Sequence, residues 1–315
     1  MSETSRPKVV GVGAANVDVH GRSRKPIVMR DSNPGLMATS VGGVTRNILE
    51  NLARQGVPVA LLSAVGDDLY GDKIVRDSTA AGIDMTHVMH KRGAVSSSYI
   101  AILDETGDML LGMSDMRIIE DMPSSYLDEQ AALLRAADAI VCDACLPVTA
   151  LDHLICEAAK GTPVLVDPVS TAYARKIEPI AGKFYAMKPN VMELSILSGL
   201  PTDTEAEMER ACEALLKRGT KRIAVSRGEK GCYYADADGN RIFRALRPVS
   251  QMVNATGAGD AFMAGLTHAL VRGLPVEEML DYALASGITA IQSMTTINPD
   301  MSDALVWENR NRYRL

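Results

Sequence analysis

Short apolar runs alternate with segments of helical periodicity along most of the chain. Lys8–Gly13, Ala139–Cys142 and Arg222–Ser226 are apolar runs that predict buried strands. Segments 204–218 and 276–294 instead carry apolar residues at helical spacing. Strands that alternate with helices are typical of a mostly parallel sheet covered on both faces. The pattern therefore predicts an α/β fold with a central sheet between two helical layers.

Two stretches depart from this rhythm. Residues 21–41 are rich in turn residues and poor in large apolar groups, which is typical of edge strands. Residues 95–113 alternate like a β-hairpin around the polar turn 104–108. Because the hairpin can pair with the earlier stretch, we expect a small β-sheet lid formed by about 16–41 and 93–115. The lid would be inserted in one domain that spans residues 1–315.

A glycine-rich segment, Asn254–Phe262, precedes a predicted helix that runs to Arg272. Gly257 and Gly259 let the backbone turn tightly, so that amide groups at the helix start can bind an anion such as phosphate. Asp260 lies at the same start, where the helix dipole favours an ionised carboxylate that can accept a proton. No lysine follows the glycines, which excludes a nucleotide-binding P-loop. The alternative is a plain glycine-rich helix cap.

Polar residues also follow two predicted strands near the amino terminus. Asn16 and Asp18 project from one face of a strand and can bind vicinal hydroxyl groups, unless that strand is simply a solvated edge. Gly42 and Gly43 precede a predicted helix and permit close approach of a ligand, and Asn47 lies in its first turn.

Two further sites lie at predicted strand ends, where open α/β sheets bind ligands. Asn190 and Glu193 share a helical face and suit Mg²⁺-bound water or phosphate oxygens, although the same pair could be a capping box. Ser226, Gly228 and Gly231 could offer a hydroxyl and amides to a nucleotide, or could form an ordinary turn.

Composition restricts the class of partner. The net charge of -6 disfavours nucleic acid and anionic membranes, so we expect a small-molecule ligand. No apolar segment has the length of a signal peptide core or of a membrane span, and we therefore expect a cytoplasmic protein.

In combination, these motifs resemble the ribokinase-like (PfkB) carbohydrate kinases over nearly the whole chain. The motifs appear in the order found in that family: Gly42-Gly43 with Asn47, Asn190 with Glu193, Ser226-x-Gly228-x-x-Gly231, and Gly257-Ala258-Gly259-Asp260. The resemblance implies a ribokinase-like fold, ATP as phosphoryl donor, Mg²⁺, and Asp260 as catalytic base. It also implies that Asn16, Asp18, Gly43 and Asn47 hold the sugar.

Within the family, the segment Asp31-Ser-Asn-Pro-Gly35 and the form Gly42-Gly-Val-x-Arg-Asn47 are most similar to the pseudouridine kinases. This likeness implies phosphoryl transfer to the 5′-hydroxyl of pseudouridine. Ser32 and Asn33 are polar residues of the predicted lid, and we expect them to bind the free ring N–H that distinguishes pseudouridine from uridine. Other nucleosides or sugars, such as ribose or adenosine, stay open as acceptors. A non-catalytic nucleoside sensor with the same fold is a second alternative.

Departures from the family pattern leave other points open. The commonest family form has Asp-Thr-Thr before Gly-Ala-Gly-Asp, whereas Asn254 and Ala255 stand at its first two positions here, so dependence on K⁺ is undecided. Leu284 stands where an asparagine often lies near the adenosine. Exposed lid strands would gain from pairing with a second copy, which predicts a homodimer.

Overall fold

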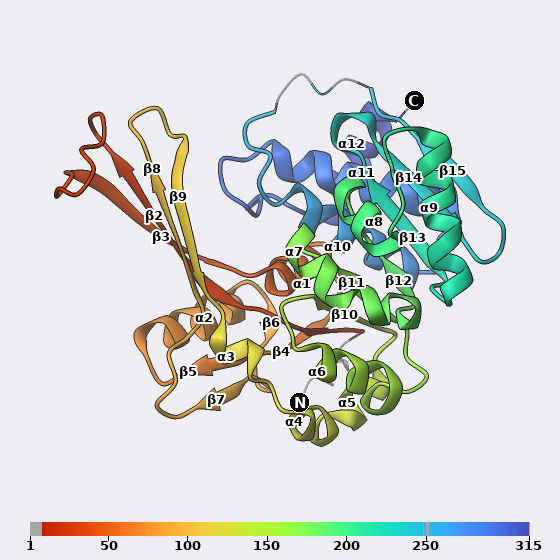
Figure 1. The fold of residues 1–315 in the computed structure, drawn as a ribbon, viewed down its shortest axis with the longest axis horizontal. Coiled ribbons are helices and arrows are strands. Elements are labelled where there is room, and N and C mark those ends of the chain that lie inside the picture. Colours follow the sequence, from red (N-terminus) through yellow and green to blue (C-terminus); the bar gives the residue numbers. More distant parts are fainter. Residues whose placement is uncertain (1–7, 248, 250–251, 315) are drawn as a thin grey trace.

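The computed structural model describes residues 8–247, 249 and 252–314. Its main element is a sheet in the order β15-β14-β13-β12-β11-β10-β1-β4-β6 (Figure 1). The strands from β13 to β6 are parallel to one another, whereas β14 pairs antiparallel with both β13 and β15. The strands are β1 (Val9–Val12), β4 (Val59–Leu62), β6 (Ile83–Asp84), β10 (Ala139–Asp143), β11 (Val164–Asp167), β12 (Ala186–Met187), β13 (Arg222–Ser226), β14 (Cys232–Asp236) and β15 (Arg241–Arg244).

Helices cover both faces of this sheet. They are α1 (Val44–Arg54), α2 (Leu69–Ala80), α3 (Arg117–Glu120), α4 (Ser124–Glu129), α5 (Ala131–Ala136), α6 (Val148–His153), α7 (Thr171–Ile177), α8 (Val191–Ser198), α9 (Glu205–Arg218), α10 (Ala258–Val271), α11 (Val276–Ile291) and α12 (Asp303–Tyr313). A π-helical turn follows α6 at Leu154–Ala158, and 3₁₀ turns lie at Glu178–Lys183 and Gly228–Lys230.

Alternation along each central strand divides the core into two layers. In β10, for example, Ile140 packs into the layer that contains α4 to α9, whereas Val141 packs into the layer that contains α1, α2, α10 and α11. Successive strand residues point to opposite faces, so a strand buried on both sides must be apolar throughout. The predicted α/β architecture is confirmed.

A second sheet extends away from this core (Figure 1). Its order is β3-β2-β8-β9, with β2 (Asn16–Ser23), β3 (Gly35–Gly42), β8 (Ser98–Leu103) and β9 (Met109–Asp115). It brings together the two stretches that were expected to form the lid. A small sheet of β5 (Ala64–Gly66) and β7 (Met89–Lys91) lies near its base.

The base of this lid is buried and its outer half is exposed. Val17 on β2 is fully buried, while residues 35–40 of β3 and 109–114 of β9 are exposed. Because only the base of the lid packs against the core, its outer half is free to contact a ligand or another molecule.

Candidate active site

The glycine-rich segment forms the amino-terminal end of α10. Gly257 is the N-cap residue with a φ of 83°, and a Cβ atom there would lie 2.1 Å from the Thr296 carbonyl oxygen. Only glycine combines this left-handed backbone with so close a neighbour. Amide groups of the first helical turn have no partner within the helix, so this end can bind an anion.

Asp260 is the third residue of α10 and is half-buried. Its Oδ2 accepts a hydrogen bond of 3.0 Å from the Asn47 amide nitrogen, so Asn47 contacts the candidate base as well as flanking the candidate sugar site. Burial and the nearby Asp167 carboxylate raise the pKa of Asp260 to about 7, against the lowering effects of Asn47 and Lys188. Desolvation therefore opposes the effect of the helix dipole, and the ionised form expected from the sequence shares the population with a protonated form near pH 7.

Lys188 supplies the cation that the glycine segment lacks. It follows β12, is 6% exposed, and its Nζ lies 2.8 Å from Asp167 Oδ2. A Cβ atom on Gly259 would lie 3.1 Å from this Nζ, which places the ammonium group against the first turn of α10. Although burial lowers it, the neighbouring Asp167 carboxylate holds the pKa of Lys188 above its usual value.

Asp143, at the end of β10, fastens the two loops beside the candidate sugar site. Its Oδ2 accepts bonds from Ala14 N at 2.8 Å and from Thr45 Oγ1 at 2.7 Å, and its Oδ1 accepts one from Cys145 N at 2.9 Å. A buried carboxylate that accepts several hydrogen bonds is stable in its ionised form and holds the groups that donate to it in place. Asp143, Asp167 and Lys188 were not among the predicted site residues. Their signal in the sequence is a charged residue that ends or directly follows an apolar strand.

The predicted sugar-binding residues meet at the base of the lid. Asn16 is 3% exposed and its Nδ2 donates to Asp18 Oδ1 at 2.6 Å. Burial raises the pKa of Asp18, although Asn16 opposes the shift. Gly42 lies directly beside Asp18, since a Cβ atom there would be 2.2 Å from Asp18 Oδ2.

Gly43 is the N-cap residue of α1, and Asn47 lies one turn further along the same helix. The φ of Gly43 is 103°, and a Cβ atom would lie 2.4 Å from the Ala14 carbonyl oxygen. These glycines thus bring the lid strands close to α1, whose Asn47 binds Asp260. We refer to the polar side chains of Asn16, Asp18, Asn47 and Asp260 together as the polar cleft.

Ser32 and Asn33 lie in the loop between β2 and β3, at the far tip of the lid. Five residues of strand, roughly 17 Å, separate Asp18 from the end of β2. The Asn33 side chain bonds within its own loop, to Val28 N at 2.8 Å and to the Val28 and Asp31 carbonyl oxygens at 3.0 Å. The structure therefore does not bring these two residues to the cleft.

A cavity of about 430 Å³ lies on the other side of the glycine segment. Ser226, Gly228, Gly231 and Gly259, which were predicted to contact the nucleotide, all line it. Its remaining wall includes the apolar side chains of Phe262, Leu284 and Ile288. Apolar walls with polar groups at one end suit a nucleotide whose base is buried and whose phosphates point to the start of α10.

Asn190 and Glu193 form a complete capping box at the start of α8. Asn190 Oδ1 accepts from Glu193 N at 2.9 Å, and Glu193 Oε2 accepts from Asn190 N at 2.8 Å. Asn190 lines a second hollow of about 460 Å³ that shares Ser226 and Gly228 with the first. The capping alternative is thus realised, and Asn190 lies in a hollow that adjoins the cavity at Ser226 and Gly228.

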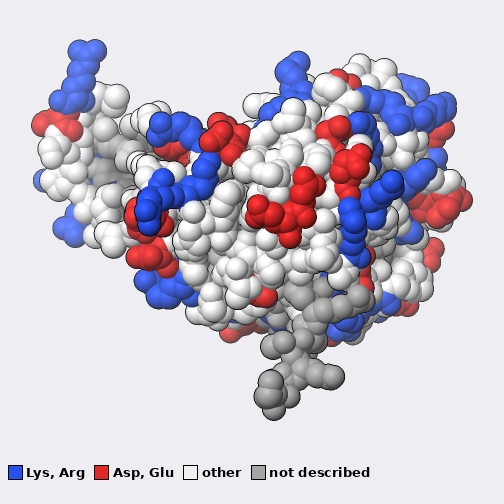
Figure 2. All heavy atoms as spheres, turned by 90° about the horizontal axis from the view of Figure 1, so that it is seen from below, with Lys and Arg blue, Asp and Glu red and all other residues white. Residues whose placement is uncertain are grey.

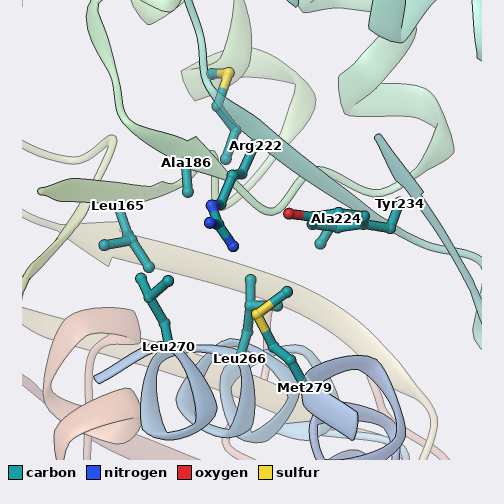
Figure 3. Close-up of a pocket in the computed structure, with 9 residues that line it drawn as sticks. Leu165, Ala186, Arg222, Ala224, Tyr234, Leu266, Leu270 and Met279 are labelled. Carbon is teal, nitrogen blue, oxygen red and sulfur yellow. The ribbon is translucent and has the colours of Figure 1, made fainter. Parts of the chain in front are cut away.

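A third hollow lies between the sheet and α10 and holds about 10 Å³, which is room for one water molecule (Figure 3). Figure 3 shows the Arg222 guanidinium among aliphatic side chains such as Leu165 and Leu266. Leu266 and Leu270 lie about two to three helical turns beyond Asp260. This hollow is a packing gap remote from the polar cleft.

Charges on the face seen in Figure 2 are mixed, with Lys and Arg interspersed among Asp and Glu. This distribution does not form the continuous basic area that a nucleic acid requires. Among the described residues, no helix has the length and apolar character needed to span a membrane.

Comparison with known proteins agrees with this geometry. Residues 6–304 match the model of the pfkB family carbohydrate kinases. Pseudouridine kinase of Escherichia coli (strain K12) is 36% identical over 299 residues, which cover 95% of each chain.

Solved structures give the same result. A putative sugar kinase from Clostridium perfringens superimposes with a TM-score of 0.87 at 31% identity, covering 98% of this chain and 97% of its own. Arabidopsis thaliana ribokinase, complexed with ribose and ATP, has a TM-score of 0.86 at 24% identity, covering 97% of this chain and 99% of its own. The fold is ribokinase-like, and the chain belongs to the pfkB family of carbohydrate kinases.

Proposed function

We propose that this protein transfers the γ-phosphoryl group of ATP to the 5′-hydroxyl of pseudouridine. The observation that carries the proposal is the position of Asp260. It accepts a hydrogen bond from Asn47 and directly follows Gly259, which lines the cavity at Ser226 and Gly228. Similarity to the Escherichia coli pseudouridine kinase supports the choice of acceptor.

In the proposed mechanism, Asn16 and Asp18 bind the ribose hydroxyls so that the 5′-oxygen faces Asp260. The ionised form of Asp260 takes the proton of that hydroxyl as the oxygen attacks the γ-phosphorus, and the bond from that phosphorus to the β–γ bridging oxygen breaks so that ADP leaves. Amides of Gly257, Ala258 and Gly259, together with the Lys188 ammonium, stabilise the charge on the transferred group. The protein contributes positioning and charge, which is what phosphoryl transfer requires.

Asn190 and Glu193 are the residues that would hold Mg²⁺, through its water ligands. The capping bonds use Glu193 Oε2 and leave Oε1 without a hydrogen bond in the described part of the chain. A carboxylate oxygen beside an amide oxygen fits the oxygen preference of Mg²⁺. When bound, the ion would neutralise charge on the triphosphate. Whether K⁺ also contributes stays open, because Asn254 and Ala255 replace the common family residues.

We also propose a cytoplasmic homodimer that pairs through the lid. The lid exposes large apolar side chains, including Met37 at 68%, Leu111 at 55% and Met113 at 65%. Contiguous apolar residues on a sheet are typical of an interaction surface. A second copy could also bring Ser32 and Asn33 near an acceptor, as could closure of the lid.

The remote position of Ser32 and Asn33 favours a second candidate, a kinase of the same family with another nucleoside or sugar as acceptor. A non-catalytic sensor is less compatible with an intact Asp260 beside Lys188.

One experiment separates these functions. Purified protein is incubated with ATP, Mg²⁺ and one acceptor at a time, and kcat/KM is measured for pseudouridine, uridine, adenosine and ribose with product identification by mass. The proposal requires the largest kcat/KM for pseudouridine. A larger value for another acceptor supports the second candidate, and no phosphorylated product with any acceptor supports the sensor.

A further inference from the structure

Arg46 is a buried cation in the first helical turn of α1, where it adjoins Asn47. Its side chain is 4% exposed, and its Nη1 lies 2.5 Å from Glu50 Oε2. A second bond runs from its Nε to Ser78 Oγ on α2, at 3.2 Å. A charged group so enclosed must have partners, and the geometry of those partners fixes the plane of the guanidinium.

The same Nη1 also faces two acceptors near the cleft. It lies 3.4 Å from Asn47 Oδ1 and 3.5 Å from the carbonyl oxygen of Val41, near the end of lid strand β3. The amide of Asn47 therefore has a cation beside its oxygen and, through the bond to Asp260, a carboxylate beside its nitrogen. A flipped amide would set its NH₂ group against the guanidinium and its oxygen against the carboxylate. Both contacts would be repulsive.

We infer that Arg46 is a positioning residue that locks the Asn47 amide in the orientation that donates to Asp260. Arg46 contacts neither Asp260 nor either cavity directly. It acts through one intervening amide, and it ties that amide to α2 and to the end of β3.

The electrostatic consequence has a definite sign. The groups that act on Asp260 are Asn47 from α1, Lys188 after β12, Asp167 at the end of β11 and Asp143 at the end of β10. The bond from Asn47 lowers the pKa of Asp260, so a misoriented amide lets that pKa rise. Charged neighbours of Arg46 are Glu50 and Arg54 on α1, Asp77 on α2 and Asp18 on β2. Loss of the guanidinium should therefore move the ionisation of the base to higher pH.

Arg54 provides a matched control. It binds the same carboxylate, Glu50, at 2.7 Å from the opposite side, but it lies two turns from Asn47 and is 29% exposed. Arg54→Met removes an arginine from the same ion-pair network without touching the amide. Arg46→Met/Glu50→Met removes both buried charges together. This double variant replaces Arg46→Met in the experiment if the single variant folds poorly.

The test has a readout that needs no acceptor. The Asp260 carboxyl is followed by ¹³C NMR as pH is varied, with assignment from Asp260→Asn. We expect Arg46→Met to raise the pKa of Asp260 by about one unit and Arg54→Met to leave it unchanged. With the acceptor that is phosphorylated in the experiment on the proposed function, Arg46→Met should lower kcat by about 10–100-fold. This is the usual effect of losing a group that orients a functional side chain.

A double-mutant cycle decides whether Arg46 acts through Asn47. In an Asn47→Ala background, Arg46→Met should have no further effect on the Asp260 titration or on kcat. An equal effect in both backgrounds would mean that Arg46 acts directly by its charge and would overturn the inference. A variant that loses only thermal stability, with the Asp260 titration unchanged, would also overturn it. The NMR result is independent of the acceptor, so it holds or fails separately from the proposed function.

Discussion

Asp260 is subject to opposing effects at the scale of single residues. Burial and Asp167 favour its protonated form, whereas Asn47 and Lys188 favour the ionised form. The result, a pKa of about 7, leaves both forms populated near neutral pH. A base with a pKa close to the working pH combines availability with driving force for proton transfer.

The first prediction concerns this carboxylate. Since the ionised form is the active one, kcat/KM should rise with pH, reach half its maximum near pH 7, and level off about one pH unit higher. Asp260→Asn should lower kcat by roughly 10²–10⁴-fold, the usual contribution of a positioned base, and should remove this dependence. Steady-state rates between pH 5.5 and 9 measure both effects. Wild-type turnover in Asp260→Asn would exclude the residue from the mechanism.

The second prediction concerns the Lys188–Asp167 pair, whose members are 6% and 3% exposed. Lys188→Met leaves a buried carboxylate without its cation, which should lower the free energy of unfolding by about 3–5 kcal/mol. Lys188→Met/Asp167→Asn removes both charges and should recover much of that stability. Denaturant unfolding measures the free energy of unfolding of both variants. Turnover should stay low in both variants, because the cation beside the glycine segment is absent. Recovery of turnover with stability would show that the pair is only structural.

The sequence predicted Asp260, Asn47 and the glycines because each belongs to a local motif. Lys188 is different, since its importance arises only when the end of β12 comes beside β11 and the start of α10. A local pattern cannot show that contact. For the same reason, the sequence did not predict that burial would raise the pKa of Asp260.

At the scale of helices and strands, local sequence patterns again indicate some elements, whereas others depend on tertiary packing. The sequence of segment 126–137 indicates one continuous helix, but α4 and α5 are separated at Gln130, whose Oε1 lies 2.9 Å from His87 Nδ1. Packing against residue 87 thus overrides helical propensity there. Helix α12 was not predicted, because few apolar residues mark its buried face; Val306 and Tyr313 are examples.

The third prediction concerns the start of α10. Gly257 and Gly273 lie at opposite ends of this helix, and both have positive φ, of 83° and 68°. Gly257→Ala would place Cβ 2.1 Å from a backbone oxygen, whereas Gly273→Ala meets nothing within 4 Å. Both variants should lose about 1 kcal/mol of stability from the backbone conformation, but only Gly257→Ala should also displace the anion-binding turn.

Rates at varied ATP concentration measure this difference. Gly257→Ala should lower kcat/KM for ATP by at least tenfold, and Gly273→Ala should leave it near the wild-type value. Equal kinetics in the two variants would argue that the turn at Gly257 does not contact the phosphates.

At the scale of the whole molecule, the lid connects the site to assembly. The sheet that carries Asn16 and Asp18 on β2 exposes Met37 on β3 and Leu111 and Met113 on β9. Turn residues in 21–41 and alternation in 95–113 predicted the lid sheet, but exposure of its outer half depends on the three-dimensional arrangement.

The fourth prediction follows from this exposure. If the lid pairs two copies, Leu111→Lys should shift the sedimentation coefficient from dimer to monomer, because it introduces a charge into an apolar contact. Leu69→Lys, at a leucine on α2 that is 84% exposed and lies outside the lid sheet, is the control and should leave the dimer intact. A wild-type protein that sediments as a monomer at micromolar concentration would contradict lid pairing.

The most direct test of the central claim is a crystal structure with pseudouridine and a non-hydrolysable ATP analogue. The account predicts the ribose hydroxyls on Asn16 and Asp18, the phosphates at Gly257–Asp260, and the 5′-oxygen within about 2.6–3.2 Å of an Asp260 carboxylate oxygen. A nucleoside bound away from Asp260, or an Asp260 carboxylate directed away from the 5′-oxygen, would contradict it.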